Sequence, residues 1–151
     1  MAAGFTLEAS QIEVLFAFLS ERLAIDQQMQ ARLRALRVDA VLSLTGAAGL
    51  PSAILARLAP FGSGHPEPRF VLPEVRLAQV RAVGSDHLRC SLTDGGNARL
   101  PAIAFRCADS ALGRSLLQHA GAPFHLAGRL QARRDGGLQL VIDDAASALL
   151  G

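Results

Sequence analysis

The sequence contains no lysine, no tryptophan and no tyrosine, and only two cysteines among its 151 residues. Cys90 and Cys107 are too few for a disulfide framework or for a zinc site with four cysteine ligands. No apolar run reaches the roughly 18 residues of a membrane-spanning helix, and the first residues lack the basic and apolar regions of a secretory signal. We therefore expect a cytoplasmic protein with reduced thiols and no membrane partner.

The fifteen basic residues are all arginines, and they are unevenly distributed. Residues 1–59 carry five arginines and five acids, whereas residues 69–134 carry ten arginines and four acids, a net charge of +6. The use of arginine alone fits either the codon bias of a GC-rich genome or the chemistry of the guanidinium group, whose planar fork suits phosphate. A neutral first part and a basic second part predict two units, the second of which faces an anion.

The first 59 residues are predicted to be mainly helical. Ser10 and Glu13 have the spacing of a capping box and precede apolar residues at helical spacing, which predicts a helix over residues 11–24. The other expected elements are a helical continuation over 27–37, a strand over 38–44, a break at Gly46 and Gly49, and a short helix over 51–59 that begins at Pro51.

A segment rich in proline and glycine follows. Three prolines and two glycines within nine residues exclude a helix or a central strand. Both a linker and an ordered, packed loop are compatible with this composition; in the ordered loop we expect Phe61 to be buried against the following domain. The residues expected to define this structural loop are Pro60, Phe61, Gly62, Gly64, His65, Pro66 and Pro68.

From residue 69 onward the apolar period becomes two, which is typical of strands. The predicted order is strands over 70–83, 87–92 and 98–106, a helix capped by Asp109 or Ser110, and strands over 123–133 and 138–142. A five-stranded barrel with one helix between its third and fourth strands is the plan of the OB fold. The predicted fold is therefore mainly β with α, a five-stranded OB-fold barrel preceded by a small helical/αβ connector. A plain α+β sandwich is the alternative.

Three segments resemble the C-terminal half of the RecJ family of single-strand-specific DNA exonucleases: PFGSGHPEPRF (60–70), VGSDHLRCSL (83–92) and AIAF (102–105). The opening MAAGFTLE resembles the stretch that follows the family's Gly-Gly-His motif. His65 departs from the family, which usually has asparagine there. The resemblance implies the end of the second nuclease-core domain plus a connector over 1–59, a Pro/Gly loop over 60–68, the OB barrel over 69–144 and a C-terminal tail over 145–151, expected to form a helical turn.

The resemblance also implies a parent enzyme that degrades single-stranded DNA from its 5′ end in DNA repair and recombination, with a divalent metal, normally manganese. The family's Asp-His-His motif is absent from this sequence. The chain is thus expected to be a piece without the catalytic centre, inactive by itself and without a cofactor. Its expected partners are single-stranded DNA, the nuclease core of its own parent chain and single-strand-binding protein.

The arginines of the basic part are the main candidates for contact with nucleic acid. OB barrels bind strands across their second and third strands, between the 1–2 and 4–5 loops, which are predicted here at 84–87 and 134–138. The candidate nucleic-acid-binding residues are His87, Arg89, Arg99, Phe105, Arg106, Arg129, Arg133 and Arg134. No catalytic residue and no metal ligand is predicted, because the histidines lack zinc spacing and Asp143–Asp144 has no histidine partner in sequence.

Two functions remain open at this point. The basic stretch favours a module that binds single-stranded DNA. The scarcity of aromatic rings, on which OB barrels usually stack bases, favours a protein-docking module that braces the nuclease core or recruits repair partners.

Overall fold

The computed structural model describes residues 6–24 and 35–150, and the chain divides into two compact units, Met1–Leu36 and Arg37–Gly151. In the first unit a 3₁₀ turn, η1 (Ala9–Gln11), leads into α1 (Ile12–Ala24), which confirms the helix predicted over residues 11–24. The predicted capping box is wrong, because the helical turn already begins at Ala9, with Glu8 as an N-cap that makes no side-chain hydrogen bond, and Ser10 lies inside this turn. The helical continuation predicted over 27–37 lies largely outside the described residues. Within the described part of the chain, no helix is long and apolar enough to cross a membrane.

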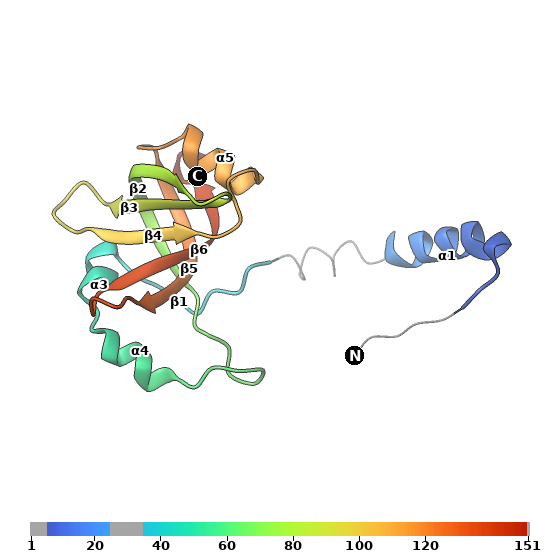
Figure 1. The fold of residues 1–151 in the computed structure, drawn as a ribbon, viewed down its shortest axis with the longest axis horizontal. Coiled ribbons are helices and arrows are strands. Elements are labelled where there is room, and N and C mark those ends of the chain that lie inside the picture. Colours follow the sequence, from blue (N-terminus) through green and yellow to red (C-terminus); the bar gives the residue numbers. More distant parts are fainter. Residues whose placement is uncertain (1–5, 25–34, 151) are drawn as a thin grey trace. The chain divides into compact units, whose positions relative to one another are not determined.

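The second unit contains six strands and several short helices (Figure 1). In chain order these are β1 (Ala40–Val41), α3 (Leu44–Gly49), α4 (Ser52–Leu58), β2 (Phe70–Val83), β3 (His87–Thr93), β4 (Leu100–Ala104), α5 (Ala111–Gln118), β5 (Pro123–Ala132), β6 (Leu138–Ser147) and the 3₁₀ turn η2 (Ala148–Leu150).

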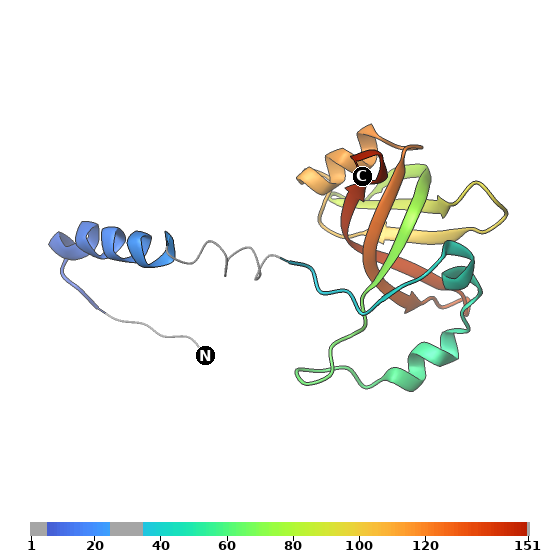
Figure 2. The same cartoon turned by 180° about the vertical axis from the view of Figure 1, so that it is seen from behind.

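Five of these strands close into a barrel. The strand order is β1-β2-β3-β4-β6-β5, and β2 pairs with β5 as well, so the sheet returns to its first long strand. β4 and β6 run parallel, whereas the other neighbouring pairs within the ring are antiparallel. Figure 2 shows β2, β5 and β6 side by side on the face opposite to that of Figure 1. The barrel, with α5 between its third and fourth strands, confirms the predicted OB plan and rules out a plain sandwich.

The barrel closes because β2 bends twice. Its first half pairs with β5 and its second half with β3, and the register shifts between Leu72 and Val75 and again between Ala78 and Arg81. Glu74 and the bulge residue Gln79 both have a φ of 55°. Such bulges turn a strand and increase its twist, which lets one strand serve both sides of a small barrel.

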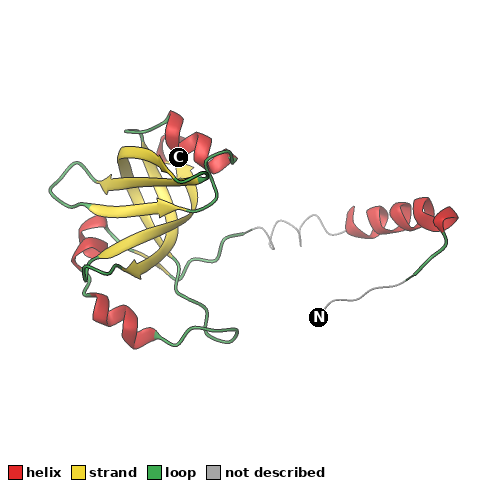
Figure 3. Cartoon of the chain, in the orientation of Figure 1, coloured by secondary structure: helices red, strands yellow, loops and turns green. Residues whose placement is uncertain are grey.

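The barrel core is built by alternation, as the sequence predicts. In β3 the side chains of Leu88, Cys90 and Leu92 are buried, while their neighbours in the strand are at least partly exposed. Leu116 of α5 and Leu44 of α3 join this core, and the two helices lie toward opposite ends of the barrel (Figure 3). Ser110, one of the two predicted caps, accepts a hydrogen bond from the Gly113 N–H at 3.1 Å.

The prediction for residues 38–49 was wrong in two respects. The strand has only two residues, and Leu44–Gly49 forms a helix, although Gly46 and Gly49 were expected to break the chain. The hydroxyl of Ser43 accepts the Gly46 N–H at 3.1 Å, and this cap starts the helix with only Leu42 and Ser43 between it and the strand. Leu44, Ala47 and Leu55 are buried in the barrel core, so α3 and α4 pack as part of the second unit.

The tail was also predicted wrongly in part. β6 continues to Ser147, beyond the end expected at residue 142, and only Ala148–Leu150 forms a helical turn. The extra residues pair with the first half of β5, from Ala127↔Asp144 to Phe124↔Ser147. An alanine-rich segment thus becomes a strand because a neighbouring strand satisfies its backbone groups.

The Pro/Gly loop is held by its own hydrogen bonds. Gly62 and His65 exchange two backbone bonds of 2.8 and 3.1 Å, and the Nε2 atom of His65 lies 2.8 Å from the Leu58 carbonyl oxygen. The expected burial of Phe61 is wrong: its side chain is 37% exposed and lies against the His65 ring, with 5.6 Å between ring centroids. This tight turn leaves the ring at the surface because its contact partner lies within the loop.

Candidate nucleic-acid interface

Two adjoining hollows lie on the outer surface of the barrel. The first has a volume of about 300 Å³ and is lined by Gln79, Arg81, Arg89, Cys90, Ser91, Pro101 and Arg133. The second, of about 390 Å³, is lined by Arg89, Ala132, Arg133, Arg134, Asp135 and Gln139. Arg89 and Arg133 belong to both, so the hollows form one surface, which we call the arginine groove.

Strand register and one turn bring these arginines together. Arg81 follows the bulge of β2 and is paired with Arg89 of β3. Arg133 and Arg134 begin the turn between β5 and β6, where the Arg133 N–H donates to the Gly137 carbonyl at 2.8 Å. Two neighbouring strands and a turn that is distant from them in sequence thus bring four arginines to the arginine groove.

The arginine groove is strongly cationic. Its one lining carboxylate, Asp135, forms an ion pair with Arg133 at 2.6 Å and also accepts the Gly137 N–H at 3.2 Å. Within the described part of the chain, Arg81, Arg89 and Arg134 form no ion pair. Guanidinium groups without a carboxylate partner are suited to fork onto phosphate oxygens.

Cys90 lies in the lining of the groove but is not a reactive thiol. The pKa of Cys90 is raised to about 12. Burial of the thiol is the main cause, and the neighbouring Cys107 is the second. Burial raises the pKa of Cys107 as well. A thiol protonated at neutral pH is a poor nucleophile and a poor metal ligand. The expectation that both cysteines are buried is confirmed, although Cys107 lies just beyond β4 and not in a strand.

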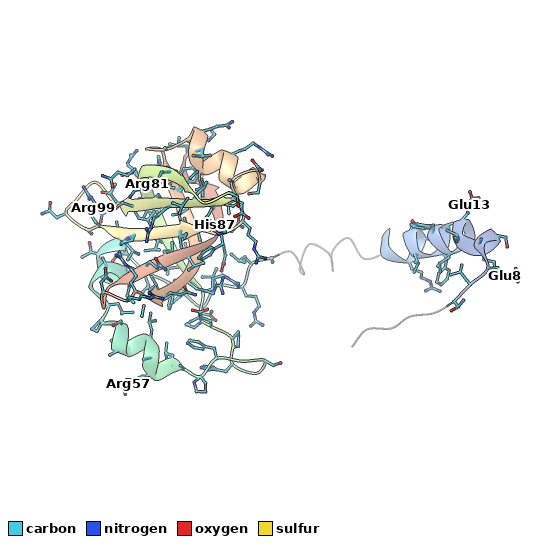
Figure 4. All side chains as sticks on the ribbon, viewed as in Figure 1. Glu8, Glu13, Arg57, Arg81, His87 and Arg99 are labelled. Atoms are coloured by element: carbon cyan, nitrogen blue, oxygen red, sulfur yellow. The ribbon has the colours of Figure 1, made fainter. Side chains whose placement is uncertain are left out.

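A second group of candidates lies where β3 begins and β4 ends. The rings of His87 and Phe105 meet edge to face, with 5.2 Å between centroids. The Nδ1 atom of His87 accepts the Arg106 N–H at 3.0 Å and lies 3.0 Å from a carboxylate oxygen of Asp86. Figure 4 labels His87 on β3, Arg81 on β2 and Arg99 at the hairpin between β3 and β4.

Arg129 and Arg99 are outside the groove lining and make internal contacts. Arg129 donates to both carboxylate oxygens of Asp143, at 2.9 and 3.2 Å, and to Glu67 at 3.3 Å. The hydrogen bond to Asp143 is the main reason why the pKa of Arg129 lies above its ordinary value. Asp143 also accepts from Arg69 at 2.8 Å, so these four residues connect the Pro/Gly loop to the barrel.

Arg99 has a comparable internal role in the β3–β4 hairpin. Its Nη1 donates to the Thr93 hydroxyl at 2.6 Å and to the carbonyls of Gly96 and Ala98, each at 2.9 Å. Of the eight predicted contact residues, the structure therefore gathers Arg89, Arg133 and Arg134 in one groove.

Arg81 and Gln79 line the groove but are not among the contact residues predicted from the sequence. Both residues lie in β2. The alternation of apolar and polar residues in that strand shows only that Arg81 points outward. The bulge that places it beside Arg89 is not visible in the apolar pattern.

The described residues provide no set of side chains that could bind a metal ion. Among residues 6–24 and 35–150, no three side chains of His, Cys, Asp or Glu gather closely enough to hold an ion. The divalent metal that the resemblance implies for the parent nuclease therefore does not fit these residues.

The closed five-stranded barrel and its single inserted helix define an OB-fold protein with a basic outer groove. A family model described as the RecJ OB domain matches residues 38–144. The chain therefore belongs to the RecJ OB-domain family, as the Pro/Gly loop and the VGSDHL segment suggested.

The solved structures that are similar include distant likenesses. A search of curated proteins found no match. Among solved structures, the S. pombe Stn1–Ten1 complex is similar with 10% identity and a TM-score of 0.43, over 52% of this chain and 57% of that one. Asparaginyl-tRNA synthetase from Pyrococcus horikoshii has 10% identity and a TM-score of 0.42, over 54% of this chain and 19% of that one. The small single-stranded DNA-binding protein from Streptomyces coelicolor has 17% identity and a TM-score of 0.40, over 56% and 97%.

Proposed function

We propose that the second unit binds single-stranded DNA, as the OB module of a RecJ-like 5′-to-3′ exonuclease that acts in DNA repair and recombination. The observation that carries this proposal is the arginine groove, in which Arg81, Arg89, Arg133 and Arg134 line one continuous surface. Membership of the RecJ OB-domain family supports the assignment to a nuclease of this type.

The groove suits a flexible, anionic chain. Phosphates can displace Asp135 from Arg133 and approach Arg81 and Arg89 without displacing any carboxylate. Because phosphate contacts carry no base information, binding through this groove is independent of sequence. Neutralising phosphates also releases counterions, so affinity falls as the salt concentration rises.

The test is a fluorescence anisotropy titration of labelled oligo-dT at several salt concentrations. For three to four phosphate contacts, the log–log plot of affinity against salt should have a slope of about −2 to −3, and Arg89→Ala should make it shallower by about 0.7. Arg57→Ala, on the exposed face of α4, is the matched control because it removes one arginine outside the groove. Its slope should equal that of the wild type.

A protein-docking module is the second candidate, and the scarcity of aromatic rings favours it. From residue 69 onward the only aromatic rings other than histidine are those of Phe70, Phe105 and Phe124, and Phe124 is buried. An unchanged slope and affinity in both Arg89→Ala and the Arg133→Ala/Arg134→Ala double variant would contradict DNA binding at the groove. Docking to protein would then be the better account.

A further inference from the structure

Two cross-strand rows lie next to each other on the outer face of β2, β3 and β4. In the first row Arg81 pairs with Arg89, which in turn pairs with Ile103. In the second row Val83 pairs with His87, and Phe105 follows the end of β4 with its ring against the His87 ring. Paired residues of an antiparallel ladder point to the same face, and rows two residues apart are separated by about 6.7 Å.

The two rows differ in chemistry. The first presents two guanidinium groups, whereas the second presents Val83 and the edge-to-face rings of His87 and Phe105. Phe105 is 49% exposed and Val83 is also exposed, so the second row is open to solvent. A cationic row beside an aromatic row matches a single nucleic-acid strand, in which a charged phosphate is followed by a base with two apolar faces.

The aromatic pair is held in position by the backbone around it. The Arg106 N–H donates to His87 Nδ1 at 3.0 Å, and Arg106 itself has a φ of 51° directly after the Phe105 ring. The N–H groups of Cys107 and Ala108 both donate to the Asp86 carbonyl, at 2.8 and 3.1 Å, which joins the end of β4 to the start of β3. A ring already fixed in this way loses little conformational freedom when a ligand stacks on it.

We propose that Phe105, supported by His87, is a stacking subsite for one unpaired nucleobase whose neighbouring phosphate lies on Arg81 and Arg89. This inference rests on the proposed function and adds to it the place where a base is held. An aromatic face accepts any base, so the subsite strengthens binding without selecting a sequence. It also compensates in part for the absence of tryptophan and tyrosine.

The experiment compares two ligands of equal length: oligo-dT, and a strand of abasic sites that keeps the phosphates but has no bases. Phe105→Ala should weaken oligo-dT binding about fivefold or more, which corresponds to about 1 kcal/mol, and should leave the salt slope unchanged. Binding of the abasic strand should not change. Arg89→Ala should weaken both ligands alike and make both slopes shallower.

Two further variants test whether Phe105→Ala weakens binding only because it disturbs the fold. Phe105→Tyr keeps a stacking ring and should restore oligo-dT binding. Phe61→Ala is the matched control, because Phe61 is also an exposed phenylalanine in contact with a histidine but lies in the Pro/Gly loop and not beside the Arg81–Arg89 row. Its affinity for both strands should equal that of the wild type.

The outcomes separate this inference from the proposed function. Equal weakening of both strands by Phe105→Ala, or no weakening of either, overturns the subsite, while the Arg89 result can still support DNA binding. Absence of salt-dependent binding to either strand overturns the proposed function, and the subsite with it. A stacked base should also quench the fluorescence of 2-aminopurine placed within an oligo-dT strand, in the wild type but not in Phe105→Ala.

Discussion

Arg81 and Arg89 are directly opposite each other in the β2–β3 ladder, so two positive charges share one cross-strand position. Like charges placed in this way destabilise a sheet. A fold that retains such a pair beside two further arginines of the groove therefore has a local electrostatic cost, which a bound anion would relieve. Because the pair opposes folding but favours binding of an anion, replacing one of the two arginines should change stability and binding in opposite directions.

We predict that Arg81→Gln stabilises the folded state by about 0.5 kcal/mol at low salt. The gain should disappear at about 1 M salt, where the screening length falls to about 3 Å. The same variant should weaken oligo-dT binding. Urea denaturation at the two salt concentrations, together with the anisotropy titration, measures both effects. Destabilisation at low salt with unaltered binding would contradict this account of the pair.

Arg129 should act on stability and not on binding. Arg129→Ala removes its bonds to Asp143 and Glu67, so we expect a loss of about 1–2 kcal/mol, given that the pair is partly exposed. The salt slope for oligo-dT should not change. Arg133→Ala serves as the comparison: it removes only a surface pair with Asp135, worth less than about 1 kcal/mol, but should make the slope shallower. A shallower slope in Arg129→Ala without loss of stability would assign Arg129 to the DNA contact.

Gly128 should tolerate no side chain. A Cβ atom at this position would lie 2.1 Å from the Val141 carbonyl oxygen, on the neighbouring strand β6. Since backbone atoms cannot move aside cheaply, Gly128→Ala should destabilise the barrel by about 2 kcal/mol or more. Gly49→Ala is the control, because its Cβ would meet no atom within 4 Å, and it should change stability by less than about 0.5 kcal/mol. Urea denaturation of both variants provides the measurement.

The buried thiol of Cys90 predicts a loss of stability at alkaline pH. Its pKa in the folded state is about 12, whereas the pKa of an unfolded cysteine is about 8.5. A raised pKa means that the unfolded chain releases the proton first, so the contribution to stability is complete below about pH 8.5 and decreases as the pH rises toward 12. In that window the free energy of unfolding of the wild type should fall faster than that of Cys90→Ala, by up to about 1.4 kcal/mol per pH unit. Parallel pH profiles for the two proteins would show that the thiol is accessible to water.

The chain by itself should not cleave DNA. The Asp-His-His motif of the RecJ family is absent from the sequence, so purified protein should leave a 5′-labelled oligonucleotide intact with manganese or with magnesium. A matched preparation from cells without the expressed protein controls for contaminating nuclease. Shortening of the oligonucleotide that depends on both metal and this protein would overturn the prediction.

The strand pattern of the barrel was readable from the sequence because each strand alternates apolar and polar residues over a long stretch. β2 begins and ends where it was expected, and the burial of Leu88, Cys90 and Leu92 follows the alternation. The prediction failed where a partner decided the structure: Ala145 and Ala146 have no strong preference for a strand, but they pair with Leu126 and His125 of β5. Local propensity is weak there and the ladder of hydrogen bonds determines the outcome.

The sequence by itself determined the class of fold, the family and the presence of a basic region, since these depend on periodicity, on short motifs and on composition. Only the tertiary structure decided which arginines act together. Arg129 was expected to face a ligand but is held by Asp143, 14 residues further along the chain, while Arg81 gained its neighbours through a bulge and a strand register. Charge contacts between distant segments depend on distances of a few ångströms, and those distances are set only when the barrel closes.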